Sequence, residues 1–146
     1  MKAFTEGLSG NRLIVDWSCD VVGCGSEYPP SVFRSVLRNR AALNRAVDFV
    51  LQRRVDRHCA ECFEVFFGRA CLMTKLMEVT GMLDVEARIV ADAAENRRRE
   101  WYLTLTGVVR RSVVCWPADV TQVDALNSDC WRAIASYLMV TDIPSR

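Results

Sequence analysis

The sequence predicts an all-α fold, organised as one domain that spans residues 1–146. The first observation is the chain length, which fits a single domain with a core of its own. The second is the recurrence of apolar residues at three- and four-residue spacing, which is typical of helices that bury one face. The third is a hydrophobic content of 51% against 25% charged residues, a composition typical of globular proteins.

In the N-terminal half, a first helix is predicted from Leu13 to Val21, because its apolar residues form one stripe. The glycines within residues 23–26 end this helix, and Pro30 suits the first turn of the next one. From Val32 to about Arg57 the apolar spacing is again helical. We expect a break somewhere in this long span, although no glycine or proline marks it.

In the middle of the chain, Cys59 to Phe67 is predicted to form a short apolar helical segment that Gly68 interrupts. A further helix is expected from Ala70 to Leu83, and another from Val85 to about Ala94. Residues 96–100 contain three consecutive arginines. This polar run is predicted to be solvated, as either a break or an exposed turn of a longer helix.

In the C-terminal part, Trp101 to Val114 is rich in residues that also favour strands. We predict a helix there, because the neighbouring segments are helical. Trp116 and Pro117 end this element, since the residue before proline disfavours the helical conformation. Val123 to Met139 is predicted to form a last pair of helices, with a break at Asn127–Ser128 and Ser128 as the cap of the second.

The charge pattern gives no sign of a nucleic-acid partner. The net charge is +1, and 18 acidic residues balance the arginine clusters at 53–54, 97–99 and 110–111. No aromatic ladder lies among these clusters, so we interpret them as solvated helix faces. No stretch reaches the roughly 18 uninterrupted apolar residues of a membrane span, which predicts that the chain has no membrane anchor of its own.

The cysteines are numerous but do not predict a disulfide framework. There are seven, an odd number, and the N-terminus lacks the apolar run of a signal peptide. Reduced thiols that serve mainly as small core residues are therefore expected.

His58, Cys59 and Cys62 are candidate metal ligands, but a zinc site needs four ligands, and only the loosely spaced Cys19 and Cys24 could complete it. Buried thiols beside a surface histidine are the favoured interpretation, and a small zinc module stays open as an alternative. Neighbouring residues on one helix do not face each other, so a Cys/His nucleophilic pair is not expected. The chain also lacks a glycine-rich phosphate loop. We therefore predict neither an enzyme nor a cofactor.

Four segments, in order along the chain, resemble the homology segments of the Bcl-2 family of apoptosis regulators. Residues 11–17 (Asn-Arg-Leu-Ile-Val-Asp-Trp) resemble the BH4 segment, and Leu37 to Leu51 stands where the BH3 segment lies. Glu61-Cys62-Phe63 followed by Gly68-Arg69 resembles BH1, and Trp116 with Trp131 resembles BH2 and the final helix. The resemblance implies a Bcl-2-like bundle of about seven or eight helices around a central hydrophobic helix, residues 70–83.

This chain also departs from the family pattern. Phe66-Phe67 replaces the Asn-Trp pair before Gly68-Arg69, and the BH3-like segment lacks its acidic residue. Such divergence, without a membrane tail, is typical of a viral homologue. The loss of the acidic residue favours a pro-survival role over a pro-apoptotic role.

The resemblance implies an inhibitor of apoptosis that sequesters the BH3 helix of pro-apoptotic proteins of the Bim, Bak or Bax type in an apolar groove. Arg69 would pair with the ligand's aspartate, and Gly68 would allow close backbone approach. The residues expected to bind the peptide are Leu43, Val47, Leu51, Cys62, Phe66, Gly68, Arg69 and Leu72.

An open apolar groove is costly in water, so a homodimer that covers it is expected. The implied location is the host cytoplasm, with recruitment to mitochondria through partners. The alternative is a host-signalling inhibitor or scaffold that uses the same fold, with a filled groove, and does not bind BH3 helices.

Overall fold

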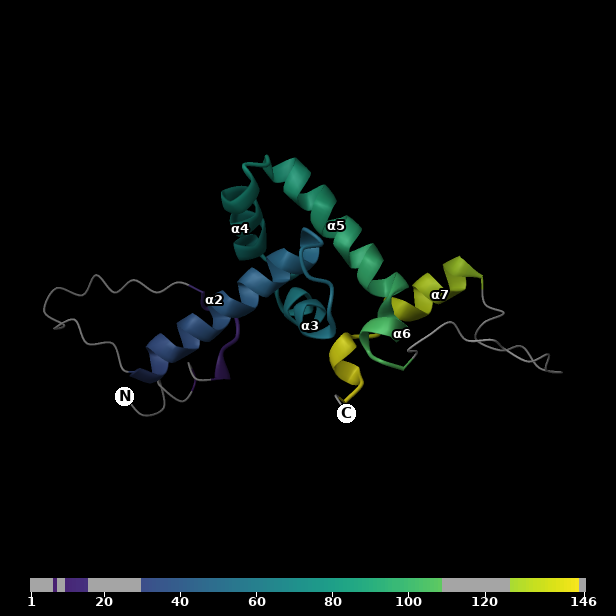
Figure 1. Cartoon of the computed structure of the whole chain (residues 1–146), viewed down its shortest axis with the longest axis horizontal. Helices are drawn as coiled ribbons and strands as arrows, with labels where there is room; N and C mark the ends of the chain where they lie inside the picture. Colours follow the sequence, from purple (N-terminus) through teal and green to yellow (C-terminus); the bar gives the residue numbers. More distant parts are fainter. Residues whose placement is uncertain (1–6, 8–9, 16–29, 109–126, 145–146) are drawn as a thin grey trace, which may run out of the picture.

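The computed structural model describes residues 7, 10–15, 30–108 and 127–144, and this part of the chain is helical without strands (Figure 1). The all-α prediction is therefore confirmed for the described residues. Six α-helices and one 3-10 helix are described, against the seven or eight helices expected for the whole chain. Their bounds are α2 Pro30–Val50, α3 Arg57–Phe66, α4 Ala70–Thr80, α5 Asp84–Glu100, α6 Tyr102–Leu105, α7 Ser128–Ala135 and η2 Val140–Asp142.

The long helix α2 begins at Pro30, as the sequence predicts, and ends at Val50. The expected break therefore lies between Val50 and Arg57. Gln52 takes a positive φ of 56° there, although it is not a glycine. The backbone N–H groups of Arg53 and Arg54 both donate to the Asp48 carbonyl, at 2.9 and 3.3 Å, and so close the end of the helix.

Helix α3 starts at an N-cap that the sequence analysis did not identify. The Asp56 side chain accepts a hydrogen bond from the Cys59 backbone N–H at 2.9 Å, which satisfies one of the unpaired donors of the first turn. The chain thereby folds back, and α3 packs against α2.

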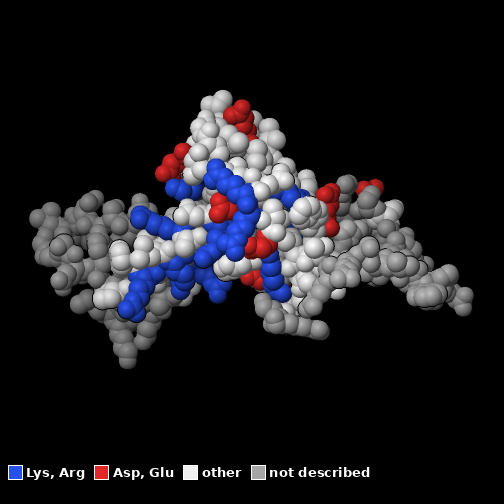
Figure 2. All heavy atoms as spheres, in the orientation of Figure 1, with Lys and Arg blue, Asp and Glu red and all other residues white. Residues whose placement is uncertain are grey.

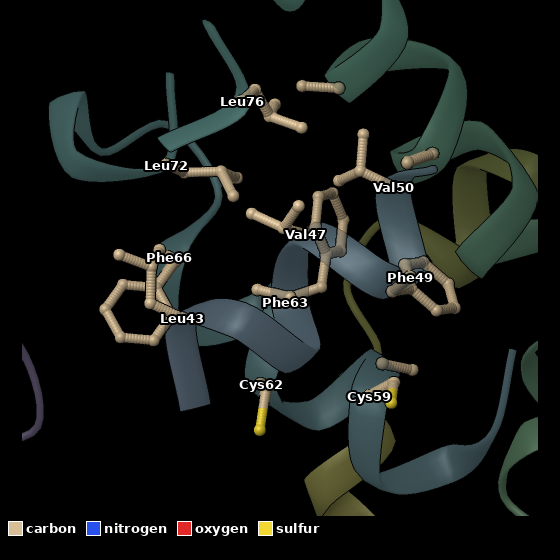
Figure 3. Packing of buried hydrophobic residues seen from close by; sticks show 14 of the residues in the cluster. Leu43, Val47, Phe49, Val50, Cys59, Cys62, Phe63, Phe66, Leu72 and Leu76 are labelled. Carbon is tan, nitrogen blue, oxygen red and sulfur yellow. The ribbon is translucent and has the colours of Figure 1, made fainter. Parts of the chain in front are cut away.

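The core is centred on these two helices. Phe63 of α3 lies beside Val47 of α2, with Leu72 and Leu76 of α4 next to them (Figure 3). Most members of the buried cluster come from α2 and α3, whereas α4 buries three residues and lies to one side of α2 (Figure 1). The helix expected to be central, residues 70–83, is formed as α4 over Ala70–Thr80, and it contributes fewer buried residues to the described core than α2 or α3.

Helices α4 and α5 form a hairpin, with Gly81 at the C-cap of α4 in a left-handed conformation (φ 75°). Helix α5 then continues without a break through residues 96–100. The predicted solvation of this run is wrong for Arg98, which is 4% exposed. Its guanidinium can be buried because two carboxylates and a backbone carbonyl accept its hydrogen bonds.

The predicted first helix is not formed where the structure describes it. Residues 11–15 have no helical conformation, and residues 16–21 lie outside the described residues. The buried Asn39 of α2 instead donates to the carbonyls of Asn11 and Ile14, at 3.1 and 2.9 Å. These side-chain hydrogen bonds give two carbonyls of the segment a partner without a helix.

In the C-terminal part, the described portion of the predicted helix from Trp101 to Val114 contains the four-residue α6, and residues 109–126 lie outside the described residues. Asn127 caps α7, not Ser128, because its side chain accepts from the Cys130 N–H at 2.8 Å. None of the helices in the described ranges is long and apolar enough to cross a membrane.

Candidate functional site

Most of the residues expected to line a peptide groove point into the core. Leu43, Val47, Cys62, Phe66 and Leu72 are all buried. Figure 3 shows Val47, Phe63 and Leu72 close together between α2, α3 and α4, whereas the sulfur of Cys62 points away from them. Leu51 is half-buried and packs against the same cluster. A ligand could contact Val47, Phe66 and Leu72 only if the helices moved apart.

Gly68 and Arg69 lie elsewhere, in the exposed connection between α3 and α4. Gly68 has a left-handed φ of 72°, and the turn places the Arg69 N–H 3.0 Å from the Phe66 carbonyl. The Arg69 carbonyl then accepts from the Leu72 N–H at 3.1 Å, which starts α4. Within the described residues the Arg69 guanidinium has no ion pair or side-chain hydrogen bond.

A pocket of about 360 Å³ opens beside this connection, between α4 and α5. Such a volume is at the low end for ligand sites, which hold roughly 300–1,000 Å³. Apolar and polar side chains share its wall. The lining residues are Phe67, Gly68, Arg69, Ala70, Met73, Thr74, Met77, Asp84, Arg88, Ala91 and Asp92. The structure therefore brings Gly68 and Arg69 to one site, together with residues of α5 that the sequence analysis did not select.

The two arginines that line this pocket differ in their ion pairing. Arg88 Nε lies 2.8 Å from Asp84 Oδ2, which pairs these two side chains one turn apart on α5. Arg69 is exposed and has no such partner among the described residues. It is therefore the cation of this pocket available to an incoming carboxylate.

A second hollow, of about 630 Å³, lies between α2 and α4. Val15 of the N-terminal segment lines it, together with Leu43 and Cys71. Lys75 is paired there with Glu78 at 2.9 Å. Most of the other residues that line this hollow are polar or charged, and Leu43 is largely turned into the core.

A buried ion network joins α3, α5 and the C-terminal segment. Arg98 contacts Glu64 at 2.9 Å and Glu95 at 2.7 Å, and it donates to the Leu138 carbonyl at 3.0 Å. Glu64 also accepts from the Val140 N–H at 2.7 Å. The spacing of Glu95 and Arg98 along one helix is a local signal of such a pair, but the contact with Glu64 depends on tertiary packing.

The two carboxylates of this network differ in pKa. Burial raises the pKa of Glu64, because the hydrogen bond from Val140 and the charge of Arg98 do not fully offset the loss of water. Burial also acts on Glu95, but hydrogen bonds from Arg98 and Arg99 outweigh it and leave the pKa of Glu95 lowered. Glu64 Oε2 is buried and has no hydrogen-bond partner among the described residues.

The candidate metal ligands do not form a site in the described part of the chain. Cys59 and Cys62 are buried, His58 is exposed, and no group of three ligating side chains occurs among the described residues. Cys19 and Cys24 lie outside those residues. Burial raises the pKa of the Cys59 thiol to about 11, which is opposite to the lowered pKa of a reactive cysteine.

Comparison with protein-family models, with curated proteins and with solved structures finds no match to this chain. The interpretation of the site therefore depends on its own chemistry. A guanidinium beside a small, partly apolar pocket is suited to binding a carboxylate-bearing surface.

Proposed function

We propose that this protein inhibits apoptosis by binding the amphipathic BH3 helix of a pro-apoptotic Bcl-2 protein. The contact would be made at the pocket between α4 and α5. The observation that carries this proposal is the exposed Arg69 at the edge of the pocket, next to apolar side chains of Phe67, Met73 and Met77. Its place of action would be the host cytoplasm, with recruitment to mitochondria through the bound partner.

The physical basis is the pairing of two kinds of contact. An amphipathic helix presents apolar residues one turn apart and can carry a carboxylate beside them. The pocket has room for one or two such apolar side chains, while Arg69 can hold the carboxylate through two parallel hydrogen bonds. Gly68 adds no side chain that would keep the ligand backbone at a distance.

This binding surface differs from the groove expected from the sequence. Of the eight residues expected to bind the peptide, Gly68 and Arg69 line this pocket, and the other six belong to the core or pack against it. In the proposed complex, these six residues hold together the helices that form the pocket and do not touch the ligand.

Isothermal titration of the full chain with a panel of synthetic BH3 peptides tests the proposal. We expect Arg69→Ala to weaken binding at least about tenfold, which corresponds to ~1.4 kcal/mol, because a ligand would cover the guanidinium. Arg53→Ala is the matched control: Arg53 is also exposed, and its ion pair with Asp48 is long, at 4.0 Å. Equal affinities for the two variants would remove Arg69 from the binding site.

A second candidate function is a host-signalling inhibitor or scaffold that does not bind BH3 helices. The burial of Leu43, Val47, Phe66 and Leu72 favours it, because a filled groove leaves no room for a ligand helix. The same peptide panel separates the two candidates. Absence of binding by every peptide, with the chain folded by circular dichroism, would favour the scaffold.

A further inference from the structure

The turn between α4 and α5 exposes large apolar side chains to solvent. Leu83 is 72% exposed, Val85 67% and Ile89 63%. Val85 and Ile89 lie one turn apart on α5, on the side away from the buried Ala87 and Ala91. We call the set Val79, Leu83, Val85 and Ile89 the turn surface.

Acidic residues surround the turn surface. Glu78, Asp84, Glu86 and Asp92 are all exposed, and Arg88 is the one basic residue between Glu78 and Asp92. Figure 2 shows acidic side chains at this end of the hairpin. Lys75 pairs with Glu78 and Arg88 with Asp84, so the net negative charge around the turn surface comes from Glu86 and Asp92.

The first half of α2 carries an apolar patch of opposite charge. Phe33 is 57% exposed and Leu37 47%, and they lie one turn apart on the side away from the buried Asn39 and Leu43. We call Phe33 and Leu37 the α2 surface. Arginines stand at positions 34, 38, 40 and 45, and the sequence has no acidic residue from 28 to 47. Figure 2 shows the basic side chains along α2.

We propose that the turn surface of one copy of this protein binds the α2 surface of a second copy. Each surface offers apolar side chains at one-turn spacing, and their flanking charges are opposite in sign. Contact between two turn surfaces would instead bring like charges together, which is costly at an interface. The self-association uses neither Arg69 nor Gly68, although Asp84 and Asp92 lie both beside the turn surface and in the lining of the pocket of the proposed BH3 contact.

A contact between two different surfaces leaves each pair of molecules with one free surface of each kind. Such head-to-tail contacts form rings or growing chains of molecules. The average mass should therefore rise with concentration above the 16.5 kDa of one chain. It should fall back in about 1 M NaCl, where the Debye length is only about 3 Å.

Sedimentation velocity on the full chain, with two variants, tests this arrangement. Phe33→Asp removes the α2 surface and Val85→Arg removes the turn surface. We expect each variant alone to sediment as a monomer. An equimolar mixture should form a dimer and nothing larger, because each variant keeps the surface that the other lacks.

Tyr137→Asp is the matched control. Tyr137 is the most exposed of the large apolar side chains in the described part of the chain, and it belongs to neither surface, so its variant should associate like the wild type. Leu37→Asp and Ile89→Asp replace the first pair if circular dichroism shows either variant unfolded. The proposal is overturned by a monomeric wild type at about 100 μM, by a mixture that stays monomeric, or by Phe33→Asp still associating alone.

Discussion

Arg98 Nη1 and Glu64 Oε1 lie 2.9 Å apart in the interior, although 34 positions separate the two residues along the chain. The pair links α5 to α3, and through Leu138 and Val140 it also holds the C-terminal segment. A buried pair is not by itself strong evidence of net stabilisation, because both charges lose water. Removal of one partner, however, leaves the other charged and buried.

We therefore predict that Arg98→Ala lowers the free energy of unfolding by about 3–5 kcal/mol, because Glu64 and Glu95 lose their common cation. Urea denaturation at pH 7 measures this loss. Arg53→Ala, which affects an exposed arginine, should change the free energy of unfolding by less than about 0.5 kcal/mol. If Arg98→Ala lowered the free energy of unfolding by as little as Arg53→Ala, the network would contribute little to stability.

The opposite pKa shifts of Glu95 and Glu64 predict opposite dependences on pH. The pKa of Glu95 is lowered in the folded state, so its stabilising contribution is fully present above its unfolded pKa and is lost as the pH falls through the folded pKa. The pKa of Glu64 is raised, so its ionised form costs stability at neutral pH, and that cost disappears on protonation.

At pH 7, Glu95→Gln should therefore destabilise the protein more than Glu64→Gln. The deficit of Glu95→Gln relative to the wild type should shrink as the pH falls below the ordinary glutamate value of 4.5. Urea denaturation curves from pH 7 to pH 3 measure both effects. A deficit that grows on acidification would contradict the assignment.

The left-handed backbone at Gly68 and Gly81 predicts a cost for any side chain there. Gly68→Ala and Gly81→Ala should each destabilise the protein by roughly 1 kcal/mol, since φ values of 72° and 75° disfavour a Cβ atom. No heavy atom would clash with that Cβ, so the effect reports backbone conformation alone. Gly10→Ala, at a glycine without positive φ, should stay within about 0.5 kcal/mol of the wild type in thermal denaturation.

The Asp56 cap predicts a measurable contribution to α3. Asp56→Ala should lower the free energy of unfolding by about 1 kcal/mol, because the Cys59 N–H loses its acceptor. Asp56→Asn, which keeps a side-chain oxygen, should recover most of the loss. If the asparagine variant were as unstable as the alanine variant, the ion pair with Arg54 would be the dominant contact.

The thiols should differ in reactivity according to burial. Cys130 is exposed, whereas Cys59 and Cys62 are buried and have raised pKa values. In the folded protein, iodoacetamide at pH 8 should therefore label Cys130 much faster than Cys59 or Cys62. Mass spectrometry of tryptic peptides measures each rate. In urea the three rates should converge, and fast labelling of Cys59 in the folded state would refute its burial.

The sequence by itself determined the helical class and the start of α2 at Pro30, because apolar periodicity and a proline's fixed φ are local properties. It also indicated that Cys59 and Cys62 are buried thiols. Only the tertiary structure decided that Arg98, in the arginine run of α5, points into the interior. Its ion-pair partner Glu64 lies on another helix, α3. Tertiary packing likewise turned Leu43, Val47, Phe66 and Leu72 into one core and left Arg69 exposed. Spacing along a helix fixes which residues share a face, but not which neighbouring helix covers that face.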